Sequence, residues 1–237
     1  MGKRIVTQRR GSGNPRYTVN SHKFLGKVSF VPLDYEGEGT VIEITRDPLH
    51  KAPLMFVDFT EYVMLMVAPE GVNVGSVIYV GKEKVEEVQK GSIMPLGKMP
   101  SGTMISNIEL VPGDGGKLVR TPGNAAKIMS TSGNKVIIQL PSKKTKEINE
   151  NCRAMVGIIA GSGASEKPML KAGNNFYKMH AVGHLYPHTS GTAMSAVDHP
   201  FGNKRTSRKA RNKPISRNAP PGRKVGSIAA RRTGKKR

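Results

Sequence analysis

The middle of the chain is built from short apolar runs that are separated by turn residues. From Gly37 onward, GTVIEITRD, LMFVDFTEYVMLMVAPEG and VGSVIYVG are rich in β-branched residues and are bounded by Gly, Pro and Asp. Runs of about five to eight residues that recur roughly every ten residues predict strands, because pleated backbone suits β-branched side chains and the helical period is weak. The polar segment at 82–90, KEKVEEVQK, predicts a loop or one exposed turn.

A second series of such runs begins near Gly91. The segment IMPLGKMPSGTMISNIEL contains Pro and Gly at intervals that exclude a long helix. GDGG and SGN are tight-turn signals, since Gly adopts the positive φ that such turns need. KVIIQL and MVGIIAG predict buried strands, and PSKKTKEINENC between them predicts a charged loop. Together the two series predict a mainly β protein with two small β-barrels in tandem.

Both ends of the chain lack such patterns. Residues 1–36 predict a basic arm, with turn chemistry at Gly11–Pro15. Beyond Gly161, GSGASEKPMLKAGNNFYKMHAVGHLYPHTSGTAMS contains Gly, Pro, Asn and Ser too densely for long helices or strands, so we expect this run to be ordered by something outside the chain. The last segment, APPGRKVGSIAARRTGKKR, predicts at most one or two helical turns, at Ser227–Arg232.

Charge separates the ends from the middle. The chain has a formal net charge of +21, with 38 Lys and Arg against 17 Asp and Glu, yet no acid lies before Val28 or after Asp198. A block of like charge repels itself, so these ends need either solvent or a polyanion. A solvated, disordered tail explains one such block, but two acid-free ends around a neutral middle favour nucleic acid. An anionic membrane is disfavoured because the ends lack an apolar helix face.

Composition excludes several classes of site. Cys152 is the single cysteine, which excludes a disulfide framework and a thiolate metal site and predicts a small buried hydrophobe. The twelve Met are expected to fill aliphatic cores, since Trp is absent. No apolar run approaches the ~18 residues of a membrane span, and no signal region follows the basic start. Val6 breaks the myristoylation pattern, and the expected location is cytoplasmic.

Two segments that resemble nucleotide-binding motifs do not match them. GDGGKL has Leu118 where a phosphate-binding P-loop needs Ser or Thr. GSGASE has Glu166 where a dinucleotide fingerprint needs Gly. The sequence therefore does not support an enzyme that uses a nucleotide.

Three histidines recur at a spacing of four. On a helix, His180, His184 and His188 would form one column, but Gly183 and Pro187 interrupt that helix. No Cys, Asp or Glu nearby completes a tetrahedral metal site. Polar contacts to RNA or water are the expected role of these side chains.

Asp198 and His199 suggest a general-base pair, with Ser190 or Ser195 as a nucleophile. Adjacent residues rarely bring their side chains together productively, and no nucleophile elbow is present. The competing interpretation is an imidazole that donates a hydrogen bond to phosphate or ribose, held by a turn at Pro200-Phe201-Gly202.

The segment SGTAMSAVDHPFGNK resembles the signature GxAMNPVDHPxGGG of the universal large-subunit ribosomal protein L-two family. KPMLKAGNNFYK, GKLVRTPGNAAKI and CRAMVGIIAG are similar to further blocks of that family. APPGRKVGSIAARRTGKKR and GKRIVTQRRGSGNPRY resemble its archaeal and eukaryotic members rather than its bacterial ones. The resemblance covers essentially the whole chain.

The sequence departs from the family at a few positions. Ser195-Ala196 replaces Asn-Pro before the Val-Asp-His, and Asn203-Lys204 replaces two glycines of the usual turn. Tyr186 and His188 stand where Trp and Arg are common. These departures concern the local backbone path.

The resemblance implies an OB-fold barrel followed by an SH3-like barrel, with long basic irregular N- and C-terminal extensions. The expected divisions are an N-terminal extension at 1–36, an OB-fold-like domain at 37–90, an SH3-like barrel at 91–170 and a C-terminal extension at 171–237.

The resemblance also implies a structural constituent of the large ribosomal subunit. Such a protein is a primary binder of ribosomal RNA (rRNA) that supports subunit assembly, subunit association, tRNA binding and the peptidyl transferase region. The alternative is a free-standing RNA-binding translation factor. The expected partners are large-subunit rRNA and other ribosomal proteins, with a possible contact to small-subunit rRNA, and neither a membrane nor a small-molecule substrate. No enzymatic activity or cofactor is expected, and Mg²⁺ only through the bound rRNA.

His199 matches the family's conspicuous histidine, and we assign it a structural, RNA-facing role. The residues expected to bind RNA are Lys3, Arg4, Arg9, Arg10, Arg16, His22, Lys23, Lys117, Arg120, Lys171, Tyr177, Lys178, His199, Lys204, Arg205, Arg208, Lys209, Arg211, Arg217, Arg223, Lys224, Arg231 and Arg232.

Overall fold

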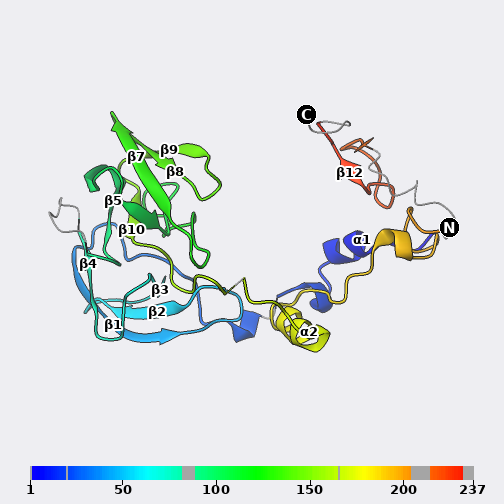
Figure 1. Ribbon diagram of the computed structural model, residues 1–237, viewed down its shortest axis with the longest axis horizontal. Coiled ribbons are helices and arrows are strands. Elements are labelled where there is room, and N and C mark those ends of the chain that lie inside the picture. Colours follow the sequence, from blue (N-terminus) through cyan, green and yellow to red (C-terminus); the bar gives the residue numbers. More distant parts are fainter. Residues whose placement is uncertain (1, 20, 82–88, 165, 204–213, 232–237) are drawn as a thin grey trace. The chain divides into compact units, whose positions relative to one another are not determined.

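The computed structural model describes residues 2–19, 21–81, 89–164, 166–203 and 214–231, and the chain divides into two compact units. We call His22–Pro168 the β body, and Met1–Ser21 together with Met169–Arg237 the basic module. Figure 1 shows the large sheet in the body and the helices α1 and α2 in the module. The predicted fold class, mainly β, is confirmed, because the body forms one continuous 10-stranded sheet.

The first four strands of the body pair in the order β3-β2-β1-β4, and all three pairings are antiparallel. They coincide with the apolar runs that predicted them. A register shift between Val41 and Glu43 marks a β-bulge, and beside it Val41 is buried whereas Ile42 is exposed. The bounds are β1 (Gly37–Thr45), β2 (Leu54–Asp58), β3 (Val63–Val67) and β4 (Val77–Val80).

The remaining strands of the body continue the sheet in the order β5-β10-β6-β7-β8-β9. β10 is the last of them in sequence, yet it pairs with both β5 and β6. The end of the second half therefore returns to the strands with which that half begins. A single parallel pairing, Val80 with Ile93, joins the two halves of the sheet. The bounds are β5 (Ile93–Pro95), the 3₁₀-helix η3 (Leu96–Lys98), β6 (Met104–Ser106), β7 (Ala126–Ser132), β8 (Lys135–Gln139), β9 (Thr145–Asn149) and β10 (Arg153–Val156).

The prediction of a charged loop between β8 and β10 was wrong in part. Residues Thr145–Asn149 form β9, which pairs with β8 along five residue pairs. Ile148 is the buried side chain of this strand, and the other four are exposed. The ladder with β8 supplies the backbone hydrogen bonds, so one buried residue suffices on a strand whose polar side chains face solvent.

Buried side chains form three clusters in the body. The first half supplies most of one, with Phe30, Met55 and Phe59 among others, and the second half supplies another, with Leu96, Ile105 and Cys152 among others. A smaller third cluster packs Leu54 and Val67 with Ile159. The prediction that Cys152 is a buried hydrophobe is confirmed, as is the role of Met as core filler for several of the twelve. A large cluster in each half of one mainly β body is consistent with an OB-fold-like barrel followed by an SH3-like barrel.

The buried Arg153 forms an ion pair within the second half of the body and hydrogen bonds to the first half. Arg153 donates from Nη2 to Glu109 Oε1 at 3.0 Å, and the backbone N–H of Arg153 donates to Glu109 Oε2 at 2.8 Å. Arg153 Nη1 also donates to the backbone oxygens of Val31 and Pro32, and its guanidinium lies over the Phe30 ring. Residues near position 30, predicted as part of the basic arm, therefore join the core of the body.

The basic module contains short elements. Asn14 Oδ1 accepts from the Arg16 backbone N–H and caps a 3₁₀ turn that begins with Pro15, as the predicted turn chemistry requires. The bounds are α1 (Val6–Gly11), η1 (Pro15–Tyr17), α2 (Ala172–Ala181), η4 (Gly191–Ala193), β11 (Pro214–Ile215) and β12 (Ser227–Ile228), and the 3₁₀-helix η2 (Ser21–Lys23) crosses the border of the two units.

The prediction that no helix of length follows Gly161 was wrong, because α2 spans ten residues. The glycines lie where a helix tolerates them. Gly173 is in the first turn, and Gly183 ends the helix with φ +68°. The Gly183 N–H donates to the His180 oxygen and the His184 N–H donates to the Met179 oxygen, which is a Schellman motif. The interruption expected at Gly183 is thus confirmed.

The expected helical turn at Ser227–Arg232 was also wrong within the described residues. Ser227–Ile228 form the extended β12, which pairs in parallel with β11. The Ala229 backbone N–H donates to the Ile215 oxygen at 2.8 Å, so the partner strand supplies the hydrogen bonds that a helix would have made internally.

Candidate nucleic-acid interface

The two units differ sharply in charge. The basic module contains 21 of the 38 Lys and Arg and a single acid, Asp198. The β body contains 17 Lys and Arg against 16 Asp and Glu, so the module carries nearly the whole net charge of +21. Concentrated positive charge attracts a polyanion and releases its condensed counterions. The module is therefore the candidate interface.

Within the module, the chain's start contacts the segment around His199. The Lys3 backbone N–H donates to the Val197 oxygen at 2.8 Å, and Lys3 Nζ lies 3.7 Å from Asp198 Oδ1. Ile5 is buried. We call residues 2–8, 195–202 and 221–222 the terminal junction, and most of them, including Lys3, Arg4 and His199, line a cavity of about 350 Å³. Segments from opposite ends of the sequence thus meet here, and Lys3, Arg4 and His199 come together as predicted site residues.

His199 is fixed in a tight turn at this junction. Its Nδ1 accepts the Phe201 backbone N–H at 3.0 Å, and its ring lies 5.1 Å from the Phe201 ring. Burial lowers the pKa of His199, which favours the neutral ring. A neutral ring that accepts at Nδ1 carries its proton on Nε2, so His199 offers one hydrogen-bond donor. A Cβ at Gly191 would lie 2.5 Å from Cε1 of this ring, so only glycine allows the ring its place.

This geometry does not form a catalytic dyad. Asp198 Oδ1 faces Lys3 Nζ, whereas His199 Nδ1 is occupied by the Phe201 N–H. Ser190 Oγ lies 2.9 Å from Thr192 Oγ1. The predicted turn at Pro200-Phe201-Gly202 does hold the imidazole, and the hydrogen bond of His199 to phosphate or ribose stays a prediction.

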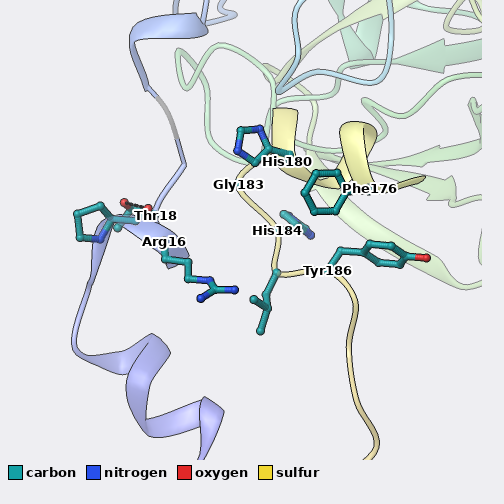
Figure 2. A pocket seen from close by; sticks show the side chains of 9 residues that line it. Arg16, Thr18, Phe176, His180, Gly183, His184 and Tyr186 are labelled. Atoms are coloured by element: carbon teal, nitrogen blue, oxygen red, sulfur yellow. Dashed lines mark hydrogen bonds between the residues drawn. The ribbon is translucent and has the colours of Figure 1, made fainter. Parts of the chain in front are cut away.

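A second cavity in the module lies between η1 and the end of α2. It has a volume of about 220 Å³ and is lined by Pro15, Arg16, Thr18, Phe176, His180, Gly183, His184, Leu185 and Tyr186. We call it the arm–helix cavity. Figure 2 shows the Arg16 side chain extending from the N-terminal segment toward the loop that carries His184 and Tyr186. Phe176 and His180 approach from α2, where their rings stack at 6.1 Å.

Gly183 brings the walls of this cavity together. A Cβ at Gly183 would lie 2.7 Å from the Thr18 backbone oxygen. The loop after α2 therefore approaches the N-terminal segment backbone to backbone. Sequence reasoning considered His180 and His184 only as metal ligands or polar contacts and did not include Phe176 or Tyr186, because no local pattern shows that they meet Arg16.

Two predicted site residues lie in the β body instead. Lys117 is exposed, and its Nζ lies 3.6 Å from Asp114 Oδ2. Arg120 is half-buried, donates from Nη1 to the Gly116 oxygen, and has its pKa lowered by burial. Arg120 is thus held by its own turn, while Lys117 remains open to a partner.

The other predicted RNA-binding residues fall into three groups. Those that are exposed in the basic module are Arg4, Arg9, Arg10, Arg16, Lys171, Tyr177, Lys178, Arg217, Arg223 and Arg231, and Lys224 there is half-buried. His22 and Lys23 are exposed at the border of the two units. Lys204, Arg205, Arg208, Lys209, Arg211 and Arg232 lie outside the described residues. Most of the 82–90 segment, which was predicted as a loop or one exposed turn, lies outside them too.

Metal and membrane features were also sought. Among the described residues, no group of three or more His, Cys, Asp or Glu is placed to hold a metal ion. In the same part of the chain, no helix has the length and apolarity needed to cross a membrane.

Comparison with known proteins identifies the family. The model of the C-terminal domain of ribosomal proteins L2 matches residues 89–219. The chain is 44% identical over 243 residues to large ribosomal subunit protein uL2 of Methanococcus aeolicus, covering 100% of both proteins. The chain belongs to the L2 family of large-subunit ribosomal proteins. It is also 44% identical to uL2 of Methanocella arvoryzae over 99% of each, and 43% identical to that of Methanococcus maripaludis.

Family membership confirms several predictions. These L2 relatives are archaeal, so the resemblance to the archaeal type is confirmed. The role as a structural constituent of the large ribosomal subunit is confirmed at the level of the family, and the alternative of a free-standing translation factor is not supported. The individual RNA-binding residues and the domain boundaries stay predictions.

Proposed function

We propose that the chain binds large-subunit rRNA chiefly through its basic module, with the β body as a folded platform. The observation that carries this proposal is the charge partition between the units. The module contains nearly all of the net charge, and among its described residues Ile5 alone is a buried apolar side chain. Phosphate neutralisation stabilises such a module against its own repulsion. In the body, residues 37–90 would form the OB-fold-like part and residues 91–170 the SH3-like part.

The contribution is structural rather than catalytic. His199 presents its Nε2–H as a hydrogen-bond donor, which suits a phosphate or ribose oxygen. The terminal junction brings this donor beside Lys3 and Arg4, so one surface combines charge with a directed hydrogen bond. This supports RNA positioning as the role of the junction, and a part in subunit assembly, subunit association, tRNA binding and the peptidyl transferase region. Mg²⁺ would enter only as an ion of the RNA.

The charges of the two units also suggest further partners. Other ribosomal proteins would contact the neutral β body, and small-subunit rRNA is a further candidate partner for exposed cations. Neither a membrane nor a small-molecule substrate is needed to account for these surfaces.

Sedimentation of lysates over a series of salt concentrations tests this proposal. We expect the full-length chain to remain with the large subunit at a salt concentration that removes loosely bound factors. His199→Ala should reduce incorporation into large subunits and should show no turnover defect, since we assign no reaction to the chain. Recovery of the chain in the ribosome-free fraction at moderate salt, or a hydrolase or transferase activity of the purified protein, would overturn the proposal.

A further inference from the structure

The arm–helix cavity has a chemistry that differs from the rest of the basic module. Elsewhere in the described part of the module the exposed charged side chains are Lys and Arg, which suit phosphate. Here one guanidinium, that of Arg16, lines the same cavity as two aromatic side chains and two imidazoles. A phosphate would gain from Arg16 alone, whereas a flat aromatic ligand could contact Phe176 or Tyr186 as well.

The size of the cavity limits the ligand. Its volume of about 220 Å³ lies below the ~300–1,000 Å³ typical of sites for drug-sized ligands. It is therefore suited to one planar ring system rather than to a whole nucleotide cofactor. Phe176 contributes an apolar ring and is 43% exposed, with the His180 ring stacked at 6.1 Å between centroids. The exposed part of Phe176 and this stacked imidazole together offer a flat surface in a cavity that Arg16 also lines.

We propose that the arm–helix cavity holds a single unpaired base extruded from ribosomal RNA. Unpaired RNA bases are recognised by stacking on aromatic side chains and guanidinium planes, with hydrogen bonds to their edges. Phe176 and Tyr186 supply the rings, Arg16 the guanidinium plane, and His180 and His184 the polar edge groups. The strongly positive charge of the module holds the RNA backbone nearby.

The walls come from segments more than 150 residues apart, and backbone contacts hold them. Asn14 caps the turn that carries Arg16, and the Schellman motif at Gly183 fixes the chain after α2. Since Gly183 touches the Thr18 backbone, the width of the cavity depends on the missing Cβ. The base site is thus built by the fold, and it deepens the proposed function on which it rests.

Photocrosslinking tests the site directly. Full-length chain is bound to protein-free rRNA extracted from large subunits and irradiated with short-wavelength ultraviolet light, which joins stacked bases to aromatic side chains. We expect mass spectrometry to find one nucleotide attached to the peptide that contains Phe176 or Tyr186. Adducts confined to peptides outside the arm–helix cavity would overturn the inference.

Variants separate stacking from charge. Phe176→Leu keeps an apolar side chain but removes the aromatic face, and we expect roughly tenfold weaker rRNA binding with an unchanged salt dependence. Phe176→Tyr should bind as the wild type does. Gly183→Ala changes none of the aromatic or charged lining residues, but its Cβ would clash with the Thr18 backbone oxygen and displace the two walls, and it should abolish the adduct. Equal affinity for Phe176→Leu and wild type would contradict a stacked base.

The outcome also distinguishes this inference from the proposed function. If wild-type chain binds rRNA with strong salt dependence but gives no adduct in the cavity, the base site fails and the function stands. If wild-type chain does not bind rRNA at all, the proposed function itself fails.

Discussion

The β body and the basic module use opposite physical strategies. The body buries a series of apolar side chains and balances 17 Lys and Arg with 16 Asp and Glu. In the module, Ile5 is the buried apolar residue among the described ones, and 21 cations stand against one acid. The body is stabilised by its own core, whereas the module gains from a polyanion. Body substitutions should therefore change the free energy of unfolding, and module substitutions should change RNA affinity and its salt dependence.

The largest effect is expected for Arg153→Ala in the body. The change leaves the fully buried Glu109 carboxylate without its cation, and it removes the bonds to Val31 and Pro32. Breaking a buried pair in this way costs about 3–5 kcal/mol. Denaturant unfolding followed by circular dichroism measures the loss. Lys135→Ala is the matched control, because its partner Glu147 is exposed and such a pair contributes only about 0–1 kcal/mol. Similar costs for both variants would show that the buried pair does not hold the body together.

A smaller loss is expected for Gly116→Ala. Gly116 has φ +85°, and an added Cβ would lie 2.5 Å from Asn107 Oδ1 and 2.6 Å from the Asn107 backbone oxygen. Strain and overpacking together should cost about 2–4 kcal/mol. Gly102→Ala is the control, since Gly102 has φ +91° but an added Cβ there meets nothing within 4 Å. It should show only the backbone strain, about 1–2 kcal/mol. Thermal unfolding of both variants gives the difference, and equal losses would exclude the contact with Asn107.

A change of about tenfold or less in RNA affinity is expected for the double variant Arg9→Gln/Arg10→Gln in the module. Both side chains are exposed in the last turn of α1. Each lost phosphate contact lowers the slope of log affinity against log salt by about 0.7–0.9, while the unfolding free energy should stay within about 0.5 kcal/mol. Filter binding to large-subunit rRNA at several salt concentrations measures the slope. The control variant Lys143→Gln/Lys144→Gln in the body should leave the salt slope unchanged. If both double variants lowered the slope equally, the module would not bind RNA in preference to the body.

The smallest effect is the pH dependence that comes from Asp114. Burial raises the pKa of this carboxyl, but the backbone N–H groups of Leu110, Gly116 and Val111 and the charge of Lys117 outweigh it, so the pKa lies below its ordinary value of 3.8. The resulting stability is fully present above pH 3.8 and is lost as the pH falls through the folded value. Asp114→Asn should flatten this part of the stability profile at a cost under about 1 kcal/mol at neutral pH. Denaturant unfolding at a series of pH values measures this effect. If the free energy of unfolding of the variant falls at acid pH as steeply as that of the wild type, Asp114 does not cause the pH dependence.

Local patterns were enough to predict much of the body. β-branched runs between turn residues located β1 to β4 and β8, because burial patterns and turn chemistry act over a few residues. The run MVGIIAG overlapped β10 only at Met155 and Val156. Local patterns did not reveal β9, since Thr145–Asn149 is a strand through its ladder with β8 and not through its own apolarity. They did not reveal α2 either, because the glycines around it were counted as breakers although Gly173 and Gly183 lie at its ends.

The candidate site shows the same limit. The sequence by itself determined that nearly all net charge lies at the two ends, and it predicted a polyanion as the partner and a tight turn at His199. Only the tertiary structure decided that Lys3 lies against Val197 and that Arg16 faces Phe176 across a cavity. It also decided that Glu109 and Arg153 form a buried pair. Charge and turn chemistry are local or additive properties of a sequence, whereas these contacts join residues 44 to 194 positions apart through the folded backbone.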